Sequence, residues 1–427
     1  MEPFSRSDTC DGSFGHAKAM DRWLPSFPIG YKAGSASLWG RGMPTLFDYL
    51  ETEHATFDEK PFGPLDSAVL SQLSMVDFGD VVAPPPTPSS GVLRRLTSVL
   101  LPAASPVRLD DAVHVADRDD RVTGLVPEDI RRCLVAGSAS PRFGGLELRY
   151  YRSVFDESSH TQFAACTFVW RDAFAYVGFR GTDVSFTGWR ENLDMAYRPQ
   201  VAAQNLARAY LEEVAPYLPH RLHVGGHSKG GNLALYAALT CSDATRGRIE
   251  RVWSHDAPGF KRGLFSEEDF APLDGRIHRT VPQDSIVGML LDCPVEPHVV
   301  SSTAVGIDQH NVFSWEIAGD DFAYRDSLSD VSRAVRDISA EWLAHVGEAR
   351  MERIADAVWA AVEASGAKDM RDVLAGGAQW FRQLVEASRR LDQESSDIIR
   401  EALGDLLNVA MRYVGRDALS SIAWMWE

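Results

Sequence analysis

The residues of this chain that are best suited to chemistry are Gly226–Gly230, whose sequence is Gly-His-Ser-Lys-Gly. This G-x-S-x-G pattern is typical of the nucleophile elbow, in which a sharp turn between a strand and a helix exposes a serine hydroxyl. Residues 221–224 have the pattern of a strand entering the turn, and residues 231–239 that of a helix leaving it. Glycines on both sides permit a turn that larger side chains would obstruct. The sequence therefore predicts Ser228 as the nucleophile of an acyl-transfer reaction.

A serine hydroxyl needs a histidine to take its proton and an acid to orient that histidine. Where this elbow occurs, the chain order is serine, acid, histidine. Asp284 follows a predicted strand at 276–281, and Asp256 follows a predicted strand at 249–254. Asp256 comes one strand earlier than expected, so we prefer Asp284 as the acid and keep Asp256 as the alternative.

The predicted base is His310, which lies in a loop after a candidate strand at 298–301. Other histidines fit less well, because they lie within predicted strands, beside the wrong loop or before the serine. These are His227, His255, His278 and His298.

The oxyanion of an acyl-transfer intermediate needs two hydrogen-bond donors. One predicted donor is the backbone N–H of Lys229, which directly follows the nucleophile. The second is expected from Thr182, after the predicted strand at 173–180, where Gly181 permits a close approach of the backbone. The alternative interpretation of this segment is a simple turn at a strand end.

The surrounding pattern alternates strands with helices, which indicates a mostly parallel sheet with right-handed crossovers. Strands are predicted at 146–154, 162–170, 173–180, 221–224, 249–254, 276–281 and 298–301, and helices at 127–136, 200–217 and 231–239. The predicted fold class is α/β, an α/β-hydrolase fold with a helical C-terminal extension. After residue 326, apolar residues recur at helical spacing.

Three regions are predicted along the chain. Residues 1–42 are rich in Gly, Ser, Asp and Pro and are expected to be a disordered tail. Residues 43–325 are expected to form the hydrolase domain, with a proline-rich loop at 83–91, and residues 326–427 a helical C-terminal region.

Composition limits the possible partners and surroundings. The formal net charge of −17 on 427 residues argues against nucleic acid as a partner. The five cysteines are scattered and never spaced as C-x-x-C, so neither a disulfide framework nor a zinc site is indicated. We expect no cofactor. No signal peptide and no apolar run of membrane-spanning length are visible, which predicts a cytoplasmic protein without an integral membrane segment.

Three segments carry a resemblance to a known group of proteins. The segments are 179–182 (Phe-Arg-Gly-Thr), 226–234 (Gly-His-Ser-Lys-Gly-Gly-Asn-Leu-Ala) and 284–290 (Asp-Ser-Ile-Val-Gly-Met-Leu). Over roughly residues 44–320 the chain resembles an uncharacterised bacterial lipase-like α/β-hydrolase family, itself similar to the class 3, fungal-type lipases.

The resemblance implies Ser228 as nucleophile, Asp284 as acid and His310 as base, with Thr182 and Lys229 forming the oxyanion hole. Two residues depart from the pattern of class 3 lipases. Asn192 stands near the position of a usual aspartate, and Lys229 replaces a neutral residue. The lysine could attract an anionic substrate or simply lie in solvent.

The predicted function is that of a serine hydrolase that cleaves a carboxylic ester or thioester through an acyl-enzyme. The expected substrate is a small-molecule or lipid-like acyl ester. Two alternatives stay open: a catalytically inactive hydrolase-like binding or scaffold protein, and an acyltransferase. The sequence leaves the acyl chain length, the protein partners and the oligomeric state open.

Overall fold

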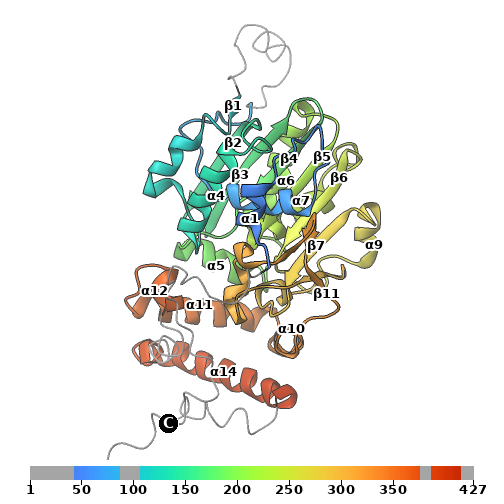
Figure 1. Ribbon diagram of the computed structural model, residues 1–427. Coiled ribbons are helices and arrows are strands. Elements are labelled where there is room, and N and C mark those ends of the chain that lie inside the picture. The colour runs from blue at the N-terminus through green and yellow to red at the C-terminus, as the bar shows by residue number, and fades with distance from the viewer. Residues whose placement is uncertain (1–42, 87–105, 376–385, 415–427) are drawn as a thin grey trace, which may run out of the picture.

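The computed structural model describes residues 43–86, 106–375 and 386–414. The predicted disordered tail at 1–42 lies outside the described residues. Within them, nine strands form one sheet in the order β1-β2-β3-β4-β5-β6-β7-β8-β11 (Figure 1). These strands are β1 (Val107–Arg108), β2 (Glu147–Asp156), β3 (Thr161–Trp170), β4 (Phe174–Phe179), β5 (Leu222–His227), β6 (Ile249–His255), β7 (Ile277–Pro282), β8 (His298–Val300) and β11 (Tyr324–Arg325). Strands β9 (Ile317–Ala318) and β10 (Asp321–Phe322) form a separate antiparallel pair.

The strands from β4 to β8 run parallel, while β1 to β4 pair antiparallel at one edge and β11 pairs antiparallel with β8 at the other. Phe179 of β4 pairs with Gly226 of β5, and His227 of β5 pairs with His255 of β6. The carboxyl ends of these three strands therefore meet at one edge of the sheet. The loops that follow them lie side by side, which is how distant parts of the chain reach a common site.

Helices cover both faces of the sheet, which defines an α/β-hydrolase fold and confirms the predicted fold class. They are α1 (Leu46–Thr52), α2 (Pro64–Leu73), α4 (Pro127–Ala139), α5 (Phe186–Asp194), α6 (Ala202–Val214), α7 (Lys229–Thr240), α8 (Asp243–Arg246), α9 (Glu267–Phe270), α10 (Asp330–Val346), α11 (Glu348–Ala364), α12 (Met370–Ala375) and α14 (Gln393–Val414). Short 3₁₀ turns are η2 (Val113–Asp117), η3 (Asp119–Arg121), η4 (Ala215–Tyr217), η5 (Ala271–Leu273), η6 (Val287–Met289), η7 (Gly306–His310) and η8 (Val312–Ser314).

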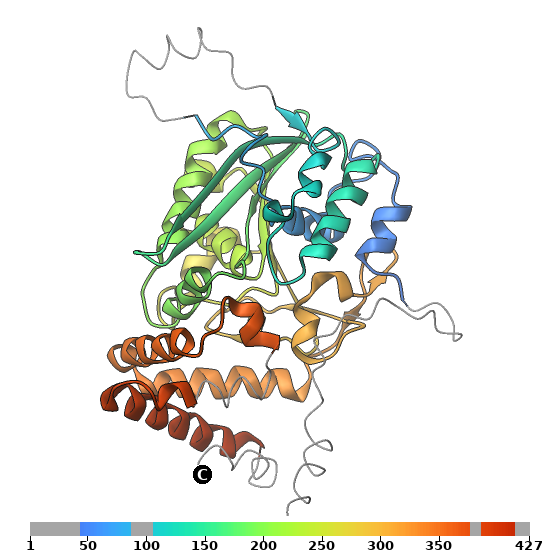
Figure 2. The same cartoon turned by 90° about the vertical axis from the view of Figure 1, so that its left-hand side faces the viewer.

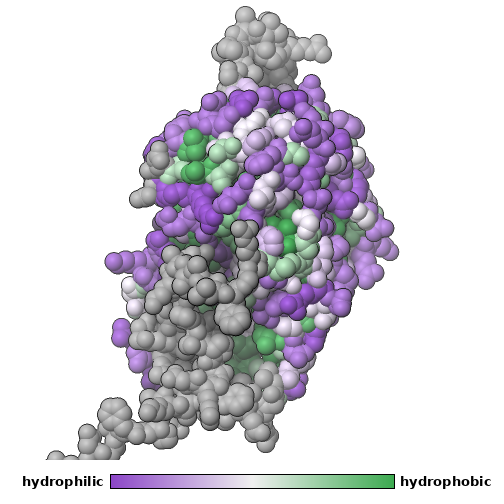
Figure 3. All heavy atoms as spheres, in the orientation of Figure 1, coloured by the Kyte–Doolittle hydropathy of each residue, from purple (hydrophilic) through white to green (hydrophobic). Residues whose placement is uncertain are grey.

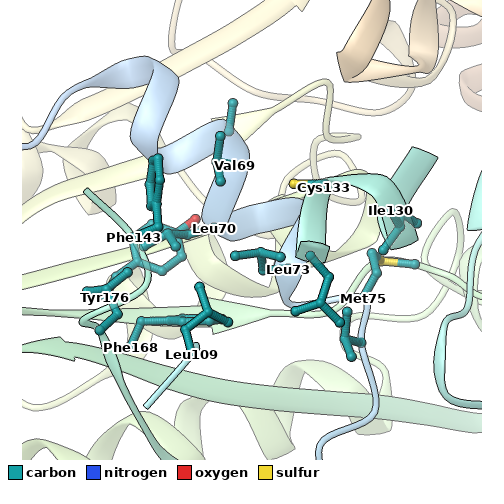
Figure 4. Close-up of a cluster of buried hydrophobic side chains, with 14 of the residues drawn as sticks. Val69, Leu70, Leu73, Met75, Leu109, Ile130, Cys133, Phe143, Phe168 and Tyr176 are labelled. Atoms are coloured by element: carbon teal, nitrogen blue, oxygen red, sulfur yellow. The ribbon is translucent and has the colours of Figure 1, made fainter. Parts of the chain in front are cut away.

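Successive side chains of a strand point to opposite faces of the sheet, so each strand contributes apolar residues to both faces. On β3, Cys166 and Phe168 pack in a core with α2 and α4, whereas Phe163 and Val169 pack in a second core with α6 and α7. Figure 4 shows the first core, where Leu70 and Leu73 of α2 lie near Phe168 and Cys133 of α4 lies close by. In Figure 2 the helices of the two cores lie on opposite sides of the sheet. Burial on both faces explains why β4 and most of β3 consist of apolar residues without a polar alternation.

Helix α5 was not predicted from the sequence, although the strands around it and helices α4, α6 and α7 were. It is short, and it begins where the Ser185 side chain accepts a hydrogen bond from the Gly188 N–H at 3.2 Å. It directly follows the loop that contains Gly181 and Thr182. Its position therefore matters for the site described below.

The predicted helical C-terminal region is present, and part of it packs against α5. Figures 1 and 2 both show α11 beside α5. Phe186 of α5 and Trp359 of α11 meet edge to face with ring centroids 5.8 Å apart. Arg190 of α5 donates to the Ala355 carbonyl of α11 at 2.9 Å. The boundary at 325/326 stays a prediction, but the two regions share a buried interface.

The visible face of the molecule is mainly hydrophilic, with small separate apolar patches (Figure 3). The four cysteines in the described ranges, Cys133, Cys166, Cys241 and Cys293, are free thiols. In the described part of the chain, every helix is too short or too polar to cross a membrane.

Candidate active site

Ser228 occupies the sharp turn that the sequence predicts. Strand β5 ends at His227 and helix α7 begins at Lys229, so Ser228 alone joins the two, with φ 57° and ψ −133°. A positive φ is costly for a residue with a side chain and is typical of strained functional positions. The flanking glycines are needed for space. A Cβ at Gly226 would lie 2.4 Å from the Gly230 carbonyl carbon, and one at Gly230 would lie 2.2 Å from the Phe179 oxygen.

His310 pairs with Asp256. Its Nδ1 lies 2.6 Å from Oδ2 of Asp256, a residue that follows β6 and is fully buried. The other carboxylate oxygen accepts the Ser285 hydroxyl at 2.5 Å and the Gly288 N–H at 3.1 Å. Burial alone would raise the pKa of Asp256, but the His310 hydrogen bond and charge with the Ser285 bond outweigh it and lower the pKa. Asp256 is therefore an ionised, fully bonded carboxylate.

The sequence-based choice of Asp284 as the partner of His310 is wrong in this structure. Strand β7, which precedes Asp284, lies one strand further from β5 than β6 does. Adjacent strands are about 4.8 Å apart, so the loop after β6 is the nearer one to the serine turn. Asp284 instead accepts a hydrogen bond from Gln309 Nε2 at 2.8 Å. The signal that could have identified Asp256 is its place directly after the strand that follows the elbow in the chain, because consecutive strands of a parallel sheet usually pair.

His227 connects the elbow to the His310 turn. Its Nε2 donates to the His310 carbonyl oxygen at 2.9 Å, and the two imidazole ring centroids are 4.5 Å apart. Burial, and then the charge of His310, lowers the pKa of His227 well below its ordinary value. His227, which directly precedes Ser228, is thus a neutral hydrogen-bond donor that holds the His310 backbone beside the serine turn.

The Gly181–Thr182 segment lies against the serine turn. A Cβ at Gly181 would be 2.9 Å from the His227 oxygen and 3.5 Å from the Ser228 Cβ. The Thr182 hydroxyl exchanges hydrogen bonds with the Asn192 side-chain amide at 2.8 and 3.1 Å. Asn192 lies on α5, so the amide at this position fixes the orientation of Thr182. The Lys229 N–H stands at the first position of α7, where helix N–H groups lack an intrahelical acceptor.

The Lys229 side chain is buried inside the protein, in contrast to both expectations from the sequence, a lysine in solvent or one that attracts an anionic substrate. It is 1% exposed, and its Nζ lies 2.9 Å from Glu191 Oε2. Burial lowers the pKa of Lys229, while the Glu191 carboxylate opposes that shift. The lysine is part of the interior between α7, α5 and β3.

The hydroxyl of Ser228 has no hydrogen-bond partner among the residues that the structure describes. Ser228 and His310 are both half-buried. Bonds between a nucleophile and its base are often long in a free enzyme and shorten only when substrate binds. Within the described ranges, no group of three or more His, Cys, Asp or Glu side chains is arranged to hold a metal ion.

The fold and these residues define an α/β-hydrolase-fold protein with a serine elbow and a buried Asp–His pair. The chain belongs to the Mbeg1-like family, which it matches over residues 137–360, more than half of its length. That match includes all the residues described above and continues through α10 into α11. None of the curated proteins compared with the chain matches it.

Several solved structures are similar to the chain. The native Rhizomucor miehei lipase propeptide complex is 17% identical, with a TM-score of 0.28, over 43% of this chain and 63% of that one. A deletion mutant of that complex is 16% identical, with a TM-score of 0.34, over 76% and 88%. The lipase from Rhizopus microsporus var. chinensis is 16% identical, with a TM-score of 0.29, over 61% and 90%. The chain thus spans less than two thirds of the first of these proteins.

Proposed function

We propose that this protein is a serine hydrolase that cleaves a carboxylic ester or thioester through an acyl-enzyme, with Ser228 as nucleophile, His310 as base and Asp256 as acid. The observation that carries the proposal is the 2.6 Å pairing of His310 with Asp256 at the sheet edge where Ser228 occupies its strained turn. A buried carboxylate, an oriented imidazole and a serine at the elbow form the arrangement that activates a serine hydroxyl.

Asp256 sets the tautomer of His310. A carboxylate only accepts hydrogen bonds, so the imidazole proton resides on Nδ1 and the lone pair on Nε2. Nε2 would take the Ser228 proton as the serine oxygen attacks the acyl carbon. The oxyanion would bind to the N–H groups of Thr182 and Lys229, in the segments that Gly181 brings into contact.

Collapse of this intermediate would break the bond to the leaving group, which takes the proton held by His310. A water molecule, deprotonated by the same imidazole, would then attack the acyl carbon. The bond from that carbon to Ser228 Oγ breaks, the imidazole returns the proton to the serine oxygen, and the carboxylic acid leaves. The substrate class is a small-molecule or lipid-like acyl ester or thioester. The cytoplasmic location and the independence of nucleic acid and cofactor stay predictions from the sequence.

The test is covalent labelling with an alkyl fluorophosphonate, which reacts with activated serines. We expect the folded protein to be labelled at Ser228, identified by peptide mass spectrometry, and denatured protein not to be labelled. Ser228→Ala should abolish both the labelling and the hydrolysis of short p-nitrophenyl esters. Ester hydrolysis that persists in Ser228→Ala would overturn the assignment.

One observation favours a second candidate, a non-catalytic hydrolase-like binding protein. The Ser228 hydroxyl lacks a hydrogen bond to His310 or to any other described residue. If Ser228 and His310 never form a hydrogen bond, the serine is not activated. Folded protein that resists the fluorophosphonate and hydrolyses no ester would favour this candidate over the enzyme.

A further inference from the structure

A buried polar network contacts the two segments proposed to bind the oxyanion, Gly181–Thr182 and Ser228–Lys229. Lys229 Nζ donates to Glu191 Oε2 at 2.9 Å, to the Gln162 carbonyl at 2.6 Å and to Gln162 Oε1 at 2.7 Å. An ammonium group has three donors, so all of them are satisfied. The three residues come from α7, α5 and β3, and each is at most 2% exposed.

The network continues to the oxyanion loop through Gln162. Its Nε2 donates to the Gly181 carbonyl at 3.4 Å, a long bond, while its Oε1 holds Lys229. Gln162 therefore links the residue that follows Ser228 to the residue that precedes Thr182. Gly188 of α5 makes room for this link, because a Cβ there would lie 2.9 Å from Gln162 Oε1.

Glu191 completes the network from α5. Its Oε2 also accepts the Gln162 N–H at 3.1 Å, and its Oε1 accepts the Ala203 N–H at 2.9 Å. The next residue, Asn192, holds the Thr182 hydroxyl. Successive residues of α5 thus fix the two sides of the proposed oxyanion hole, Lys229 on one and Thr182 on the other.

An apolar contact would be the ordinary way to join these elements. Burying a lysine and a glutamate carries a large desolvation penalty, and replacing such a pair by apolar residues is often neutral or stabilising. Hydrogen bonds are directional, so a network of them sets the distances between particular backbone groups, which an apolar contact does not. The proposed chemistry requires fixed distances, because two N–H donors must bind one oxygen atom.

We propose that Lys229, Glu191 and Gln162 are positioning residues that fix the Gly181–Thr182 loop relative to the Ser228–Lys229 turn. This inference rests on the proposed hydrolase function. The network touches neither substrate nor the reacting atoms. It acts through the backbone N–H groups of Thr182 and Lys229.

Two variants test the network, and neither leaves a buried charge without its partner. Gln162→Leu cuts the link to Gly181 but keeps the Lys229–Glu191 pair. The double variant Lys229→Met/Glu191→Gln removes both charges together. The matched control is Arg142→Met/Asp66→Asn, which removes another ion pair whose side chains are 0% and 2% exposed, at 2.6 Å. That pair bonds Tyr49 and the 55–61 loop, none of which belongs to the proposed site.

The measurements are made on folded protein below the unfolding temperature of each variant. The first is the maximal rate of Ser228 phosphorylation by diisopropyl fluorophosphate and the concentration that gives half of it. The second is the ³¹P chemical shift of the adduct, whose phosphoryl oxygen occupies the oxyanion position. A displacement of about 1 Å can lower a rate about a hundredfold. We expect both network variants to lose about tenfold or more of the maximal rate, with little change in the half-saturating concentration and with a shifted ³¹P resonance.

The control should lose thermal stability while keeping the wild-type rate and resonance. Wild-type rate and ³¹P shift in both network variants would overturn the positioning role while leaving the hydrolase proposal intact. A loss of rate in the control as large as in the network variants would also overturn it, because general destabilisation would then explain the effect. Wild-type protein that is not labelled at all would overturn the hydrolase function itself, and this inference with it.

Discussion

Asp284 and Gln309 are joined by two hydrogen bonds: the Asp284 N–H donates to Gln309 Oε1 at 2.9 Å, and Gln309 Nε2 donates to Asp284 Oδ2 at 2.8 Å. Gln309 precedes His310 in the 3₁₀ turn η7 and is 1% exposed. Asp284 therefore supports the backbone that carries the imidazole, whereas Asp256 bonds the imidazole itself. Two aspartates from neighbouring loops act on one histidine in different ways.

This difference predicts unequal effects of two isosteric substitutions. Asp256→Asn can present an amide N–H to His310 Nδ1, which moves the imidazole proton to Nε2 and removes the base. A comparable change in a serine protease costs about 10⁴-fold in kcat, and we expect a loss of about 10³-fold or more here. Asp284→Asn retains an acceptor for Gln309 and should cost about 1 kcal/mol in unfolding free energy, with a far smaller loss of activity. Ester hydrolysis and urea unfolding measure the two effects, and a larger activity loss in Asp284→Asn would contradict the assignment.

Local features of this site could be predicted from the sequence, and those that depend on strand neighbours could not. The elbow around Ser228 is set by adjacent residues, so the strand, turn and helix were predicted correctly. The choice between Asp256 and Asp284 depends on which strand lies beside β5. Both aspartates follow strands, and the sheet order, with β6 beside β5 and β7 beyond it, decides between them.

The surroundings of Lys229 show the same limit. Its position at a helix start says nothing of Glu191 and Gln162, which lie 38 and 67 residues away in the chain. Glu191 belongs to α5, a nine-residue helix that was not predicted. A lysine at a helix start is therefore expected to be exposed to solvent, unless the sequence also indicates a buried acidic partner.

Gly181→Ala tests the close packing of the Gly181–Thr182 segment, the proposed oxyanion loop, against the serine elbow. The added Cβ would lie 2.9 Å from the His227 oxygen, so the loop must move. We expect a loss of about 1–3 kcal/mol in stability and a fall of about tenfold or more in the fluorophosphonate labelling rate. Gly137→Ala in α4 is the control, because a Cβ there meets only the Leu73 and Leu109 side chains, at the ordinary contact distances of 3.8 and 4.0 Å. It should leave labelling unchanged and slightly raise the unfolding temperature. Normal labelling in Gly181→Ala would show that this loop does not form part of the site.

Arg190→Met tests the attachment of the C-terminal helices to α5. The Arg190 side chain is 4% exposed and bonds the Ala355 carbonyl, Asp194 and Asp356. Its removal leaves the Ala355 carbonyl without this donor, at a cost of about 1–3 kcal/mol. We expect faster amide hydrogen exchange across Glu348–Ala364.

The control for this experiment is Arg353→Met, in which an ion pair between α11 and α14 is lost. Arg353 and Glu394 are 2.8 Å apart, but their side chains are 58% and 74% exposed. Exposed pairs contribute about 0–1 kcal/mol, so exchange in α11 should change little. Equal exchange in both variants would show that Arg190 does not hold the two regions together.

The stability of the protein should fall on mild acidification because of buried neutral histidines, of which His255 is the clearest. It is fully buried, and its Nε2 lies 2.9 Å from the Ser67 hydroxyl. Its Nδ1 has no hydrogen-bond partner among the described residues. Burial, and then the charge of His278, lowers the pKa of His255 to about 3. In the unfolded chain the pKa of histidine is about 6.5.

The sign of the effect follows from these two values. Between pH 6.5 and 3 the unfolded state binds the proton and the native state does not, so acidification favours unfolding. The loss of unfolding free energy due to His255 is nil above pH 6.5 and reaches about 2 kcal/mol at pH 5. In His255→Gln, the difference in unfolding free energy between pH 7.5 and pH 5 should therefore shrink by about 2 kcal/mol. Urea titrations at the two pH values measure it, with His220→Gln as the control, since His220 is exposed. An unchanged difference in His255→Gln would mean that this imidazole is already protonated, or reached by water, in the native state.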